Sequence, residues 1–479
     1  MPTAVVSELA RFLVRSDEQE DICFVLWRPS HGRRRATAIV VDALLPKEGE
    51  RHVHGDVSFE GSYFLRCVLE AREQRCGLGI IHTHPGGVGW QGLSLNDTIA
   101  ESGHAGQAEV VTGLPLLGLT LGTGSMKCSA RFWRRLGDRK FEPVWCESVR
   151  VVGEQMTMNF NPALRPPPSV NRRQTRTRSA WGSQMQTDLV RMRIGVIGVG
   201  SVGALVAESL VRMGVIDVTL IDYDSVEEKN LDRLLHATQD DAIKSTLKVE
   251  SLQRGLLQSG TADALNINAL DGSLVEAPTL EEALDLDILF CCVDRHWARS
   301  VCNYLAYVHL IPVIDGGVAV TPGPNRMVGA EWRAHVAAPG RKCLECIRQY
   351  DPAHVSLERT GQLEDHGYIE EMLLCDELLP AGENVFAFAA AAAAAEVLQF
   401  LAMVVAPAGV RRSPAQLFHF ASGTVDLDKD PCQSNCLYSG MWLAQGDSLD
   451  VTVTGLDYAA AAARSRRPST VRTPEPGKS

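Results

Sequence analysis

The sequence predicts an α/β protein with two domains, and three features of the chain indicate this. Apolar, β-branched segments alternate with helical segments near the N-terminus, and the same alternation returns after residue 190. A stretch rich in proline and arginine separates the two regions. Alternation of strands and helices predicts βαβ units with a parallel sheet. The length of 479 residues is sufficient for both domains.

The first region predicts a small α/β domain over residues 1–150. Its expected strands are rich in β-branched and apolar residues. One helix, with interspersed polar and apolar residues, is expected after the second strand. The expected strands are Ile22–Trp27, Thr37–Asp42 and Gly77–His82, and the expected helix is Gly61–Gln74.

Residues 151–178 are predicted to form an extended linker. Four prolines and five arginines fall between Asn159 and Arg178, and this composition does not favour a buried core. A second domain is expected over 179–455. Residues 456–479, rich in alanine, arginine and proline, are expected to be a disordered tail.

The second domain is predicted to contain a mostly parallel, Rossmann-like sheet. Its expected strands alternate with at least one helix, which begins directly after a glycine-rich turn. The expected strands are Met192–Ile197, Asp217–Ile221, Asp287–Cys292 and Ile311–Ile314, and the expected helix is Val202–Met213.

Composition narrows the range of partners. The net charge of −11 and a pI near 5.7 argue against nucleic acid and anionic membranes and favour a protein or small-molecule partner. The thirteen scattered cysteines, and a start without a basic segment and long apolar run, predict a reducing cytoplasm. The apolar run 385–405 has the length of a membrane span, but Glu396 at its centre favours a packed soluble helix.

A metal-ligand pattern follows the strand expected at residues 77–82. His82 and His84 are two residues apart on an extended segment, so both imidazoles point the same way, and Asp97 can supply an oxygen. These three ligands leave a fourth position for water, whose pKa a zinc ion would lower. Ser94 could donate a hydrogen bond to the developing oxyanion. For an HxH pair alone, polar residues at a strand end would be the better interpretation.

The run His82-Thr83-His84-Pro85 with Ser94 and Asp97 resembles the motif of the JAMM (JAB/MPN+) metallo-isopeptidases. This resemblance implies catalytic zinc and amide cleavage, with a glutamate from an early strand as general base. Glu20 stands at the matching place before an apolar strand, and Glu18 and Asp21 are its neighbouring alternatives.

A glycine-rich turn predicts a phosphate site in the second domain. Gly198, Gly200 and Gly203 follow an expected strand and open a helix, so backbone amides and the helix N-terminus can face phosphate. Asp222, at the end of the next strand, can hold a ribose. A dehydrogenase would have the same turn and acidic residue.

The segment after this turn resembles the adenylating enzymes of the E1/MoeB/ThiF family. Asp222-Tyr223-Asp224-Ser225-Val226 continues into Asn230-Leu231-Asp232-Arg233, similar to that family's DxDxV and NLxR signatures. The resemblance implies ATP rather than NAD. It assigns ribose to Asp222 within the acidic motif that includes Asp224, and phosphates to Asn230 and Arg233.

The same resemblance implies three further roles. Lys248, with Lys244 as its alternative, would bind the triphosphate, and Asp294 would orient Mg²⁺ and the attacking carboxylate. The family often forms homodimers in which an arginine reaches the partner's ATP. Arg176 is the best match for that arginine, and Arg178 is the alternative.

Two close cysteine pairs predict a structural zinc site. Cys343 and Cys346 form the first pair and Cys432 and Cys436 the second, a pattern suited to a tetrahedral four-thiolate centre. Cys375 lies between the pairs, with Pro380 five positions further on. In similar single-domain E1 enzymes this crossover segment carries the thioester-forming cysteine, which is expected to be Cys375.

These resemblances imply a bifunctional enzyme for a ubiquitin-like modifier, as in bacterial conjugation systems that include components of antiphage operons. One domain would trim or release the modifier, and the other would adenylate its C-terminus with MgATP and capture it on Cys375 for an E2-like partner. The main alternative is activation of a sulfur-carrier protein for thiocarboxylate formation, in which Cys375 would be dispensable. A non-enzymatic scaffold is a third interpretation.

Overall fold

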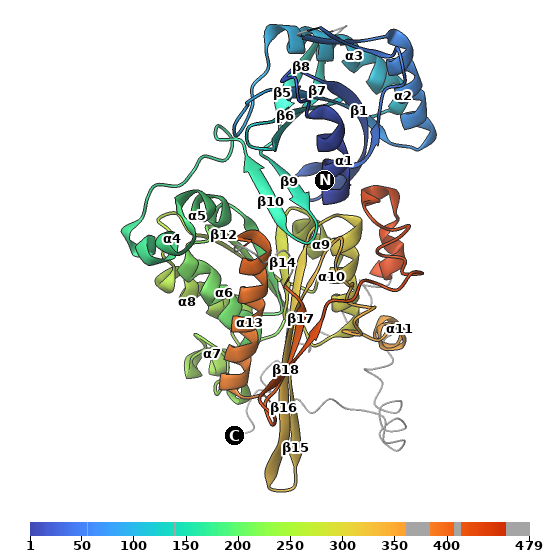
Figure 1. Cartoon of the computed structure of the whole chain (residues 1–479). Coiled ribbons are helices and arrows are strands. Elements are labelled where there is room, and N and C mark those ends of the chain that lie inside the picture. The colour runs from blue at the N-terminus through green and yellow to red at the C-terminus, as the bar shows by residue number, and fades with distance from the viewer. Residues whose placement is uncertain (55, 138–139, 361–383, 407–412, 457–479) are drawn as a thin grey trace, which may run out of the picture.

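The computed structural model describes residues 1–456 except 55, 138–139, 361–383 and 407–412. The chain is an α/β protein with two large mixed sheets, one of six strands and one of eight. In Figure 1 the six-stranded domain is the upper, blue part of the molecule. The hairpin of β9 and β10 lies between it and the larger domain below.

The N-terminal domain is built on a sheet of order β2-β1-β5-β6-β7-β8. Its two central strands place alternate side chains on opposite faces, as the two-residue period of a strand requires. Phe24 and Ile80 pack with helices α2 and α3, whereas Val25 and Ile81 pack on the side of α1. The elements are α1 (Thr3–Leu13), β1 (Ile22–His31), β2 (Ala36–Leu44), β3 (Arg51–His54), β4 (Asp56–Phe59), α2 (Gly61–Glu73), β5 (Gly77–His84), α3 (Leu95–Thr112), β6 (Leu117–Gly122), β7 (Lys127–Gly137), β8 (Lys140–Trp145), β9 (Ser148–Val152) and β10 (Met156–Phe160).

The C-terminal domain has a sheet of order β13-β12-β11-β14-β15-β16-β17-β18. Strands β13 to β15 are parallel, and β15 to β18 are antiparallel. The strands are β11 (Arg193–Ile197), β12 (Asp217–Asp222), β13 (Asn266–Asp271), β14 (Ile288–Cys291), β15 (Val313–Gly323), β16 (Arg326–Ala337), β17 (Ala415–His419) and β18 (Thr424–Asp428).

Helices cover both faces of this sheet. Val196 of β11 packs with α6, α8 and α13, whereas the next residue, Ile197, packs with α9 and α10 on the other face. The helices and 3₁₀ turns are η1 (Arg172–Gln174), α4 (Thr175–Trp181), α5 (Ser183–Val190), α6 (Ser201–Met213), η2 (Glu228–Asn230), α7 (Gln239–Lys244), α8 (Lys248–Ser259), α9 (Ala277–Leu284), α10 (His296–Val308), α11 (Pro352–Thr360), α13 (Phe386–Val404), η4 (Gly446–Ser448) and η5 (Val451–Thr454).

The strands and helices expected from the sequence are all present, with ends that differ by a few residues except at β1 and β15, which run further. The sheet of the second domain is less parallel than expected, because β15 continues into a long antiparallel hairpin with β16. This hairpin reaches the lower end of the molecule in Figure 1. Strand β15 continues through glycines and β-branched residues, which have low helix propensity and are compatible with an extended strand.

Within the segment expected to be a linker, the structure has an ordered hairpin strand. Strand β10 pairs with β9, and its Met156, Met158 and Phe160 are buried in the core that β11 and α6 also build. Arg165 then donates to the backbone oxygen of Arg191 and pairs with Asp217. The hairpin of β9 and β10 therefore packs into the core of the second domain, which Ile39 of β2 also joins.

Helix α13 is the one described helix long and apolar enough to cross a membrane. It packs on the sheet against β15, β16 and α6. Glu396 and Gln399 on this helix are buried inside the protein. Figure 1 shows the helix lying along the sheet beside α6.

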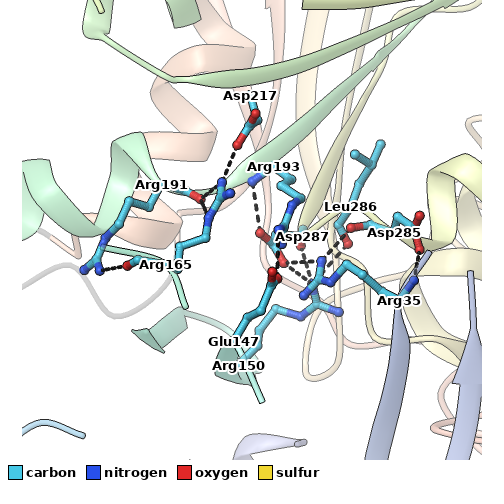
Figure 2. A network of polar contacts seen from close by, with 10 residues as sticks. All are labelled: Arg35, Glu147, Arg150, Arg165, Arg191, Arg193, Asp217, Asp285, Leu286 and Asp287. Carbon is cyan, nitrogen blue, oxygen red and sulfur yellow. Dashed lines mark hydrogen bonds and ion pairs between the residues drawn. The ribbon is translucent and has the colours of Figure 1, made fainter. Parts of the chain in front are cut away.

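Asp287 is the centre of a polar network that joins the two domains (Figure 2). It precedes β14, and its side chain is 1% exposed. One carboxylate oxygen accepts hydrogen bonds from Arg35 at 3.1 Å and Arg150 at 3.2 Å, both from the N-terminal domain. The other accepts from the backbone N–H of Arg193 at 2.9 Å. Burial alone would raise the pKa of Asp287, but the arginines hold it below its usual value.

Replacing Asp287 by asparagine should strongly destabilise the protein. The variant keeps the side-chain shape but leaves the largely covered Arg35 and Arg150 without their counter-charge, and breaking a buried pair in this way typically costs about 3–5 kcal/mol. Chemical denaturation near neutral pH measures this loss. Because the folded pKa is depressed, the contribution is present above the pKa of an unfolded aspartate and disappears as the pH falls through the folded value.

The difference between wild type and Asp287→Asn should therefore shrink on acidification. Asp240→Asn is the matched control, because Asp240 pairs with Lys244 on the surface and both side chains are about two-thirds exposed. That control should leave the denaturation midpoint nearly unchanged. Equal midpoints for both variants at neutral pH would contradict a stabilising role for Asp287.

Candidate functional site

The HxH pair and the aspartate of the first motif meet in space. Strand β5 ends at His84, so its two histidines project from one side of the strand end, and the N-terminus of α3 brings Asp97 beside them. His82 Nε2 lies 3.2 Å from His84 Nε2 and 3.6 Å from Asp97 Oδ1, and His84 Nε2 lies 3.5 Å from Asp97 Oδ2. Tetrahedral zinc with bonds of about 2.0–2.2 Å has ligand atoms about 3.3–3.6 Å apart. The residues fit a zinc ion.

A capping box orients the Asp97 carboxylate. Ser94 is the N-cap of α3: its hydroxyl accepts a hydrogen bond from Asp97 N at 3.1 Å, and its own N–H donates to Asp97 Oδ2 at 2.8 Å. The Ser94 hydroxyl is thus used as an acceptor, which leaves its proton available to donate. Ser94 is exposed beside the three candidate ligands, as the hydrogen-bonding role predicted for it requires.

The electrostatics of His82 and Asp97 suit metal binding. Burial lowers the pKa of His82 to about 3, so its imidazole is neutral near pH 7. The hydrogen bond to Asp97 raises the pKa of His84. Burial opposes the charge of Asp97, but His84, His82 and Ser94 hold its pKa well below the usual range. A neutral imidazole and an ionised carboxylate are the forms that bind zinc.

Strand register brings Glu20 near this cluster. Strand β1 pairs with β5 in antiparallel register, with Ile22 opposite His82, so the chain two residues earlier lies opposite His84. The negative charge of Glu20 acts on His84. Glu18 is instead exposed, in a left-handed turn with φ of 55°. The geometry therefore favours Glu20 over Glu18 as the candidate base.

The neighbouring Asp21 is buried and holds local structure together. Its side chain is 1% exposed and accepts a hydrogen bond from Arg51 at 2.6 Å. Its backbone exchanges hydrogen bonds with Thr83, between the two histidines: Asp21 N donates to the Thr83 hydroxyl at 2.8 Å, and Thr83 N donates to Asp21 O at 3.0 Å. These contacts join the residue after Glu20 to the metal-ligand strand.

The glycine-rich turn of the second domain is shaped for close approach to a ligand. Gly198 has φ of +82°, a left-handed conformation that favours glycine. A Cβ at Gly203 would lie 1.9 Å from the backbone oxygen of Gly198, so only glycine fits there. Gly200 is the N-cap of α6, and a Cβ there would meet open space. The open N-terminus of α6 is suited to a phosphate.

Asp222 closes this turn from the end of β12. Its carboxylate accepts hydrogen bonds from Val199 N and Asp224 N, both at 2.8 Å. Burial raises the pKa of Asp222. The side chain therefore lies between the glycine-rich turn and the acidic motif beyond it, where the sequence predicts the ribose.

A lysine and three carboxylates converge beside the turn. Lys248 Nζ lies 2.7 Å from Asp224 Oδ2, and the lysine side chain is 13% exposed. Burial opposes its charge, but Asp222, Asp224 and Asp294 raise its pKa above the usual value. Asp294 is exposed, just after β14. Lys244 instead pairs with Asp240 on the surface, so Lys248 is the better candidate for a phosphate ligand.

The other predicted nucleotide residues lie on short surface elements. Asn230 is the last residue of η2, and its side-chain oxygen accepts from Glu227 N at 3.0 Å. Arg233 donates to Lys229 O at 2.7 Å, and its side chain is 24% exposed. Arg176 is exposed on α4. Arg178, its alternative, donates to the Ser183 hydroxyl at 2.9 Å.

The two cysteine pairs form one cluster. The loop after β16 carries Cys343 and Cys346, and the loop after β18 carries Cys432 and Cys436, with all four sulfurs within 4.8 Å of one another. Cys343 N donates to Cys432 Sγ at 3.1 Å, and Cys346 N donates to Cys343 Sγ at 3.3 Å. Contact with Cys343 lowers the pKa of Cys432 to about 5. This donor set fits structural zinc.

Residues 172–436, which include the turn, the acidic motif and the cysteine cluster, match the ThiF family model. The chain belongs to the ThiF family. The N-terminal metal-ligand cluster lies outside the matched residues.

Three known proteins illustrate what the ThiF domain is similar to. Ubiquitin-like modifier-activating enzyme 5 of Gallus gallus is 29% identical over 126 residues, which are 24% of this chain and 32% of that protein. Sulfur carrier protein ThiS adenylyltransferase of Bacillus subtilis (strain 168) is 30% identical over 167 residues, 35% of this chain and 46% of that protein. This chain thus spans about a third to a half of these relatives. A crystal structure of E. coli MccB with ATP is 19% identical, with a TM-score of 0.44, and covers 57% of this chain and 75% of that one.

Cys375 lies outside the described residues, and the described residues on either side of it belong to the ThiF domain. Before it, Glu358 of α11 accepts hydrogen bonds from His296 N and Trp297 N, both at 3.0 Å, at the start of α10. After it, Asn384 donates to the Ser201 hydroxyl at 2.7 Å, next to the glycine-rich turn. Glu358 therefore lies at the start of α10, and Asn384 lies beside the glycine-rich turn.

Sequence reasoning missed a buried group behind the metal-ligand cluster. Glu101, Arg131 and Trp133 form a hydrogen-bonded set next to His82. The one sequence signal was the spacing of Glu101 four residues after Asp97, which places both on the same helix face. Nothing in the sequence indicated that Arg131, on a distant strand, would meet them.

Proposed function

We propose that this chain is a bifunctional enzyme that acts on the C-terminus of a ubiquitin-like protein. The N-terminal domain would cut an amide bond after the modifier's last glycine, in a precursor or a conjugate. The ThiF domain would then activate the freed carboxylate with MgATP. The observation that carries the proposal is that one chain holds a zinc-compatible ligand set and, in a second domain, a glycine-rich turn that leaves the N-terminus of α6 open.

In the peptidase half, the chain would supply zinc ligands, a base and an oxyanion donor. A zinc ion held by His82, His84 and Asp97 would supply Lewis acidity to the scissile carbonyl and to water. Glu20 would accept the proton of the attacking water and deliver it to the leaving amine nitrogen. The Ser94 hydroxyl would donate a hydrogen bond to the carbonyl oxygen as negative charge develops there.

In the activating half, a modifier carboxylate oxygen would attack the α-phosphorus of ATP and displace pyrophosphate, forming an acyl-adenylate. This attack joins two negatively charged groups, so neutralisation of charge dominates the chemistry. Lys248, Arg233 and the open N-terminus of α6 would offset the phosphate charge, and Asp294 would hold Mg²⁺. The name of the Gallus gallus relative, a modifier-activating enzyme, supports this substrate class.

A thioester on Cys375 would complete the cycle. The Cys375 thiolate would attack the acyl-adenylate carbonyl, form a C–S bond and release AMP, and the acyl group would pass to an E2-like partner. The contacts of Glu358 with the start of α10 and of Asn384 with Ser201, on either side of residues 361–383, support this assignment. A homodimer, with Arg176 reaching the partner's nucleotide, and a reducing cytoplasm are further parts of the proposal.

The relative from Bacillus subtilis supports a second candidate function. Its name describes adenylylation of the sulfur carrier ThiS, so the substrate here could instead be a sulfur-carrier protein. In that case sulfur would displace AMP from the adenylate, and Cys375 would not be required. The two functions therefore differ in their dependence on this cysteine.

One experiment tests the proposal. The protein is incubated with MgATP and a ubiquitin-like protein that ends in its terminal glycine or carries a short C-terminal extension. We expect both substrates to form a covalent adduct that a thiol reductant removes. The extended substrate should form this adduct only after its extension has been cleaved off. Cys375→Ala should abolish the adduct and Cys302→Ala, a buried cysteine of α10, should not. A reducible adduct in Cys375→Ala would move the nucleophile elsewhere, and adenylate without adduct in wild type would favour the sulfur carrier.

A further inference from the structure

Glu101 is buried directly behind the metal-ligand cluster. It lies on α3 one turn after Asp97, and its side chain is 2% exposed. Its Oε1 is 3.6 Å from His82 Nδ1. The other ring nitrogen of His82, Nε2, faces His84 and Asp97. The imidazole of His82 therefore lies between a buried carboxylate and the place of the metal.

The Glu101 carboxylate is held firmly in this position. Arg131, a fully buried residue of β7, donates from Nε at 2.9 Å and also pairs through a second guanidinium nitrogen. Trp133 Nε1 donates at 2.7 Å. Gly118 on β6 leaves the space for this set, because a Cβ there would lie 2.2 Å from Glu101 Oε2.

Arg131 also fixes the other polar group near His82. Its Nη1 donates to the Thr120 hydroxyl at 2.6 Å, and that hydroxyl lies 3.5 Å from His82 Nε2. One neighbour of each ring nitrogen of His82, Glu101 at Nδ1 and Thr120 at Nε2, is therefore held by the same buried arginine.

We infer that Glu101 is a positioning residue whose carboxylate, 3.6 Å from His82 Nδ1, favours the tautomer with the proton on Nδ1 and Nε2 free to bind, and so sets the zinc affinity of this site. The inference rests on the zinc site of the proposed function and deepens it. A carboxylate on the second nitrogen of a ligating histidine orients the ring and increases its basicity. Loss of such a partner typically reduces metal affinity by about 10–100-fold.

A second pair between the same two elements shows that stability alone does not explain Glu101 and Arg131. Glu109 of α3 pairs with Arg135 of β7 at 2.7 Å, but both of these side chains are at least one-third exposed. The Glu101–Arg131 pair is buried, and desolvation of two charges can exceed the attraction between them. An apolar pair of similar size can stabilise such a contact as well as a buried ion pair, but it would not place a carboxylate beside His82 Nδ1.

The test measures metal affinity of the purified full-length protein by competition with a chromophoric chelator. The principal variant is Glu101→Leu/Arg131→Met, which removes the carboxylate without leaving a buried, unpaired arginine. Glu101→Gln keeps an acceptor oxygen but not its charge. Glu109→Gln is the matched control on the same helix. We expect about 10–100-fold weaker zinc binding in the double variant, a smaller loss in Glu101→Gln and none in the control.

Cobalt substitution gives a second readout that a merely structural role would not change. Co²⁺ bound at His82, His84 and Asp97 has visible bands that report its coordination, whereas the four-cysteine site has thiolate charge-transfer bands in the near ultraviolet. The variants should change the visible bands of the histidine site and leave the thiolate bands unchanged. The cysteine site thus serves as an internal control for folding.

The outcomes separate this inference from the proposed function. Wild-type protein that binds metal only at the cysteines would remove the zinc site itself, and with it the peptidase proposal. Wild-type protein that binds two metals, with unchanged zinc affinity and cobalt bands in Glu101→Leu/Arg131→Met, would overturn the role of Glu101 alone. If that variant lost the thiolate bands together with the histidine-site bands, Glu101 and Arg131 would be needed for folding. That result would also overturn the inferred role of Glu101.

Discussion

Replacing Asp294 by alanine is expected to reduce ATP–pyrophosphate exchange, driven by a cognate modifier, by at least about 100-fold, the usual effect of removing one preorganised electrostatic group. Asp294 follows β14 on the exposed side of the nucleotide site, and its charge acts on Lys248. Without it, Mg²⁺ would lose its proposed anchor next to the attacking carboxylate. Exchange of labelled pyrophosphate into ATP measures this step before any thioester forms.

The control for Asp294 is Asp240→Ala. Asp240 is an exposed aspartate of α7 whose partner is the surface residue Lys244, so its loss should leave exchange unchanged. Both variants should keep the thermal stability of the wild type, because both side chains are exposed. Normal exchange in Asp294→Ala would be incompatible with adenylation at this site.

Replacing Glu20 by glutamine should reduce cleavage of a C-terminally extended modifier by about 10²–10⁴-fold, the usual contribution of a general base. Glutamine keeps the shape of the side chain but cannot accept the proton of the attacking water. Zinc content should remain that of the wild type, because the candidate ligands are His82, His84 and Asp97. Cleavage rates and bound zinc are measured on the same preparation.

Glu18→Gln is the matched control for Glu20, two residues earlier in the chain. Glu18 is exposed, whereas the charge of Glu20 acts on His84. The control should cleave at the wild-type rate. If Glu20→Gln is fully active and Glu18→Gln is not, the assignment of the base is reversed. Loss of zinc in Glu20→Gln would instead make Glu20 a ligand.

Much of both candidate sites was predictable because local sequence encodes them. His82 and His84 lie on one strand, and Ser94 and Asp97 form one capping box, so a few residues position each pair. In the glycine-rich turn, Gly198 and Gly203 are required by backbone geometry that reaches only five residues along the chain. Motif spacing carries this information directly.

Other features were not predictable because they depend on contacts between distant segments. The resemblance already favoured Glu20, but the physical reason that separates it from Glu18 is the register between β1 and β5, which pairs residues about sixty positions apart. The segment expected to be a linker contains β10 because Met158 and Phe160 find a core built by later strands. A composition rich in proline and arginine does not reveal such a partner.

By itself, the sequence determined the α/β class, the place of the strands and helices with the clearest patterns, the two ligand motifs and the match to an adenylating signature. Those properties depend on period, propensity and spacing along short stretches of chain. Only the tertiary structure decided that Glu101 and Arg131 lie behind His82. It also decided that Asp287 joins the two domains through its ion pairs with Arg35 and Arg150. Buried charges must find partners wherever the fold brings them, and that pairing is a property of three-dimensional packing.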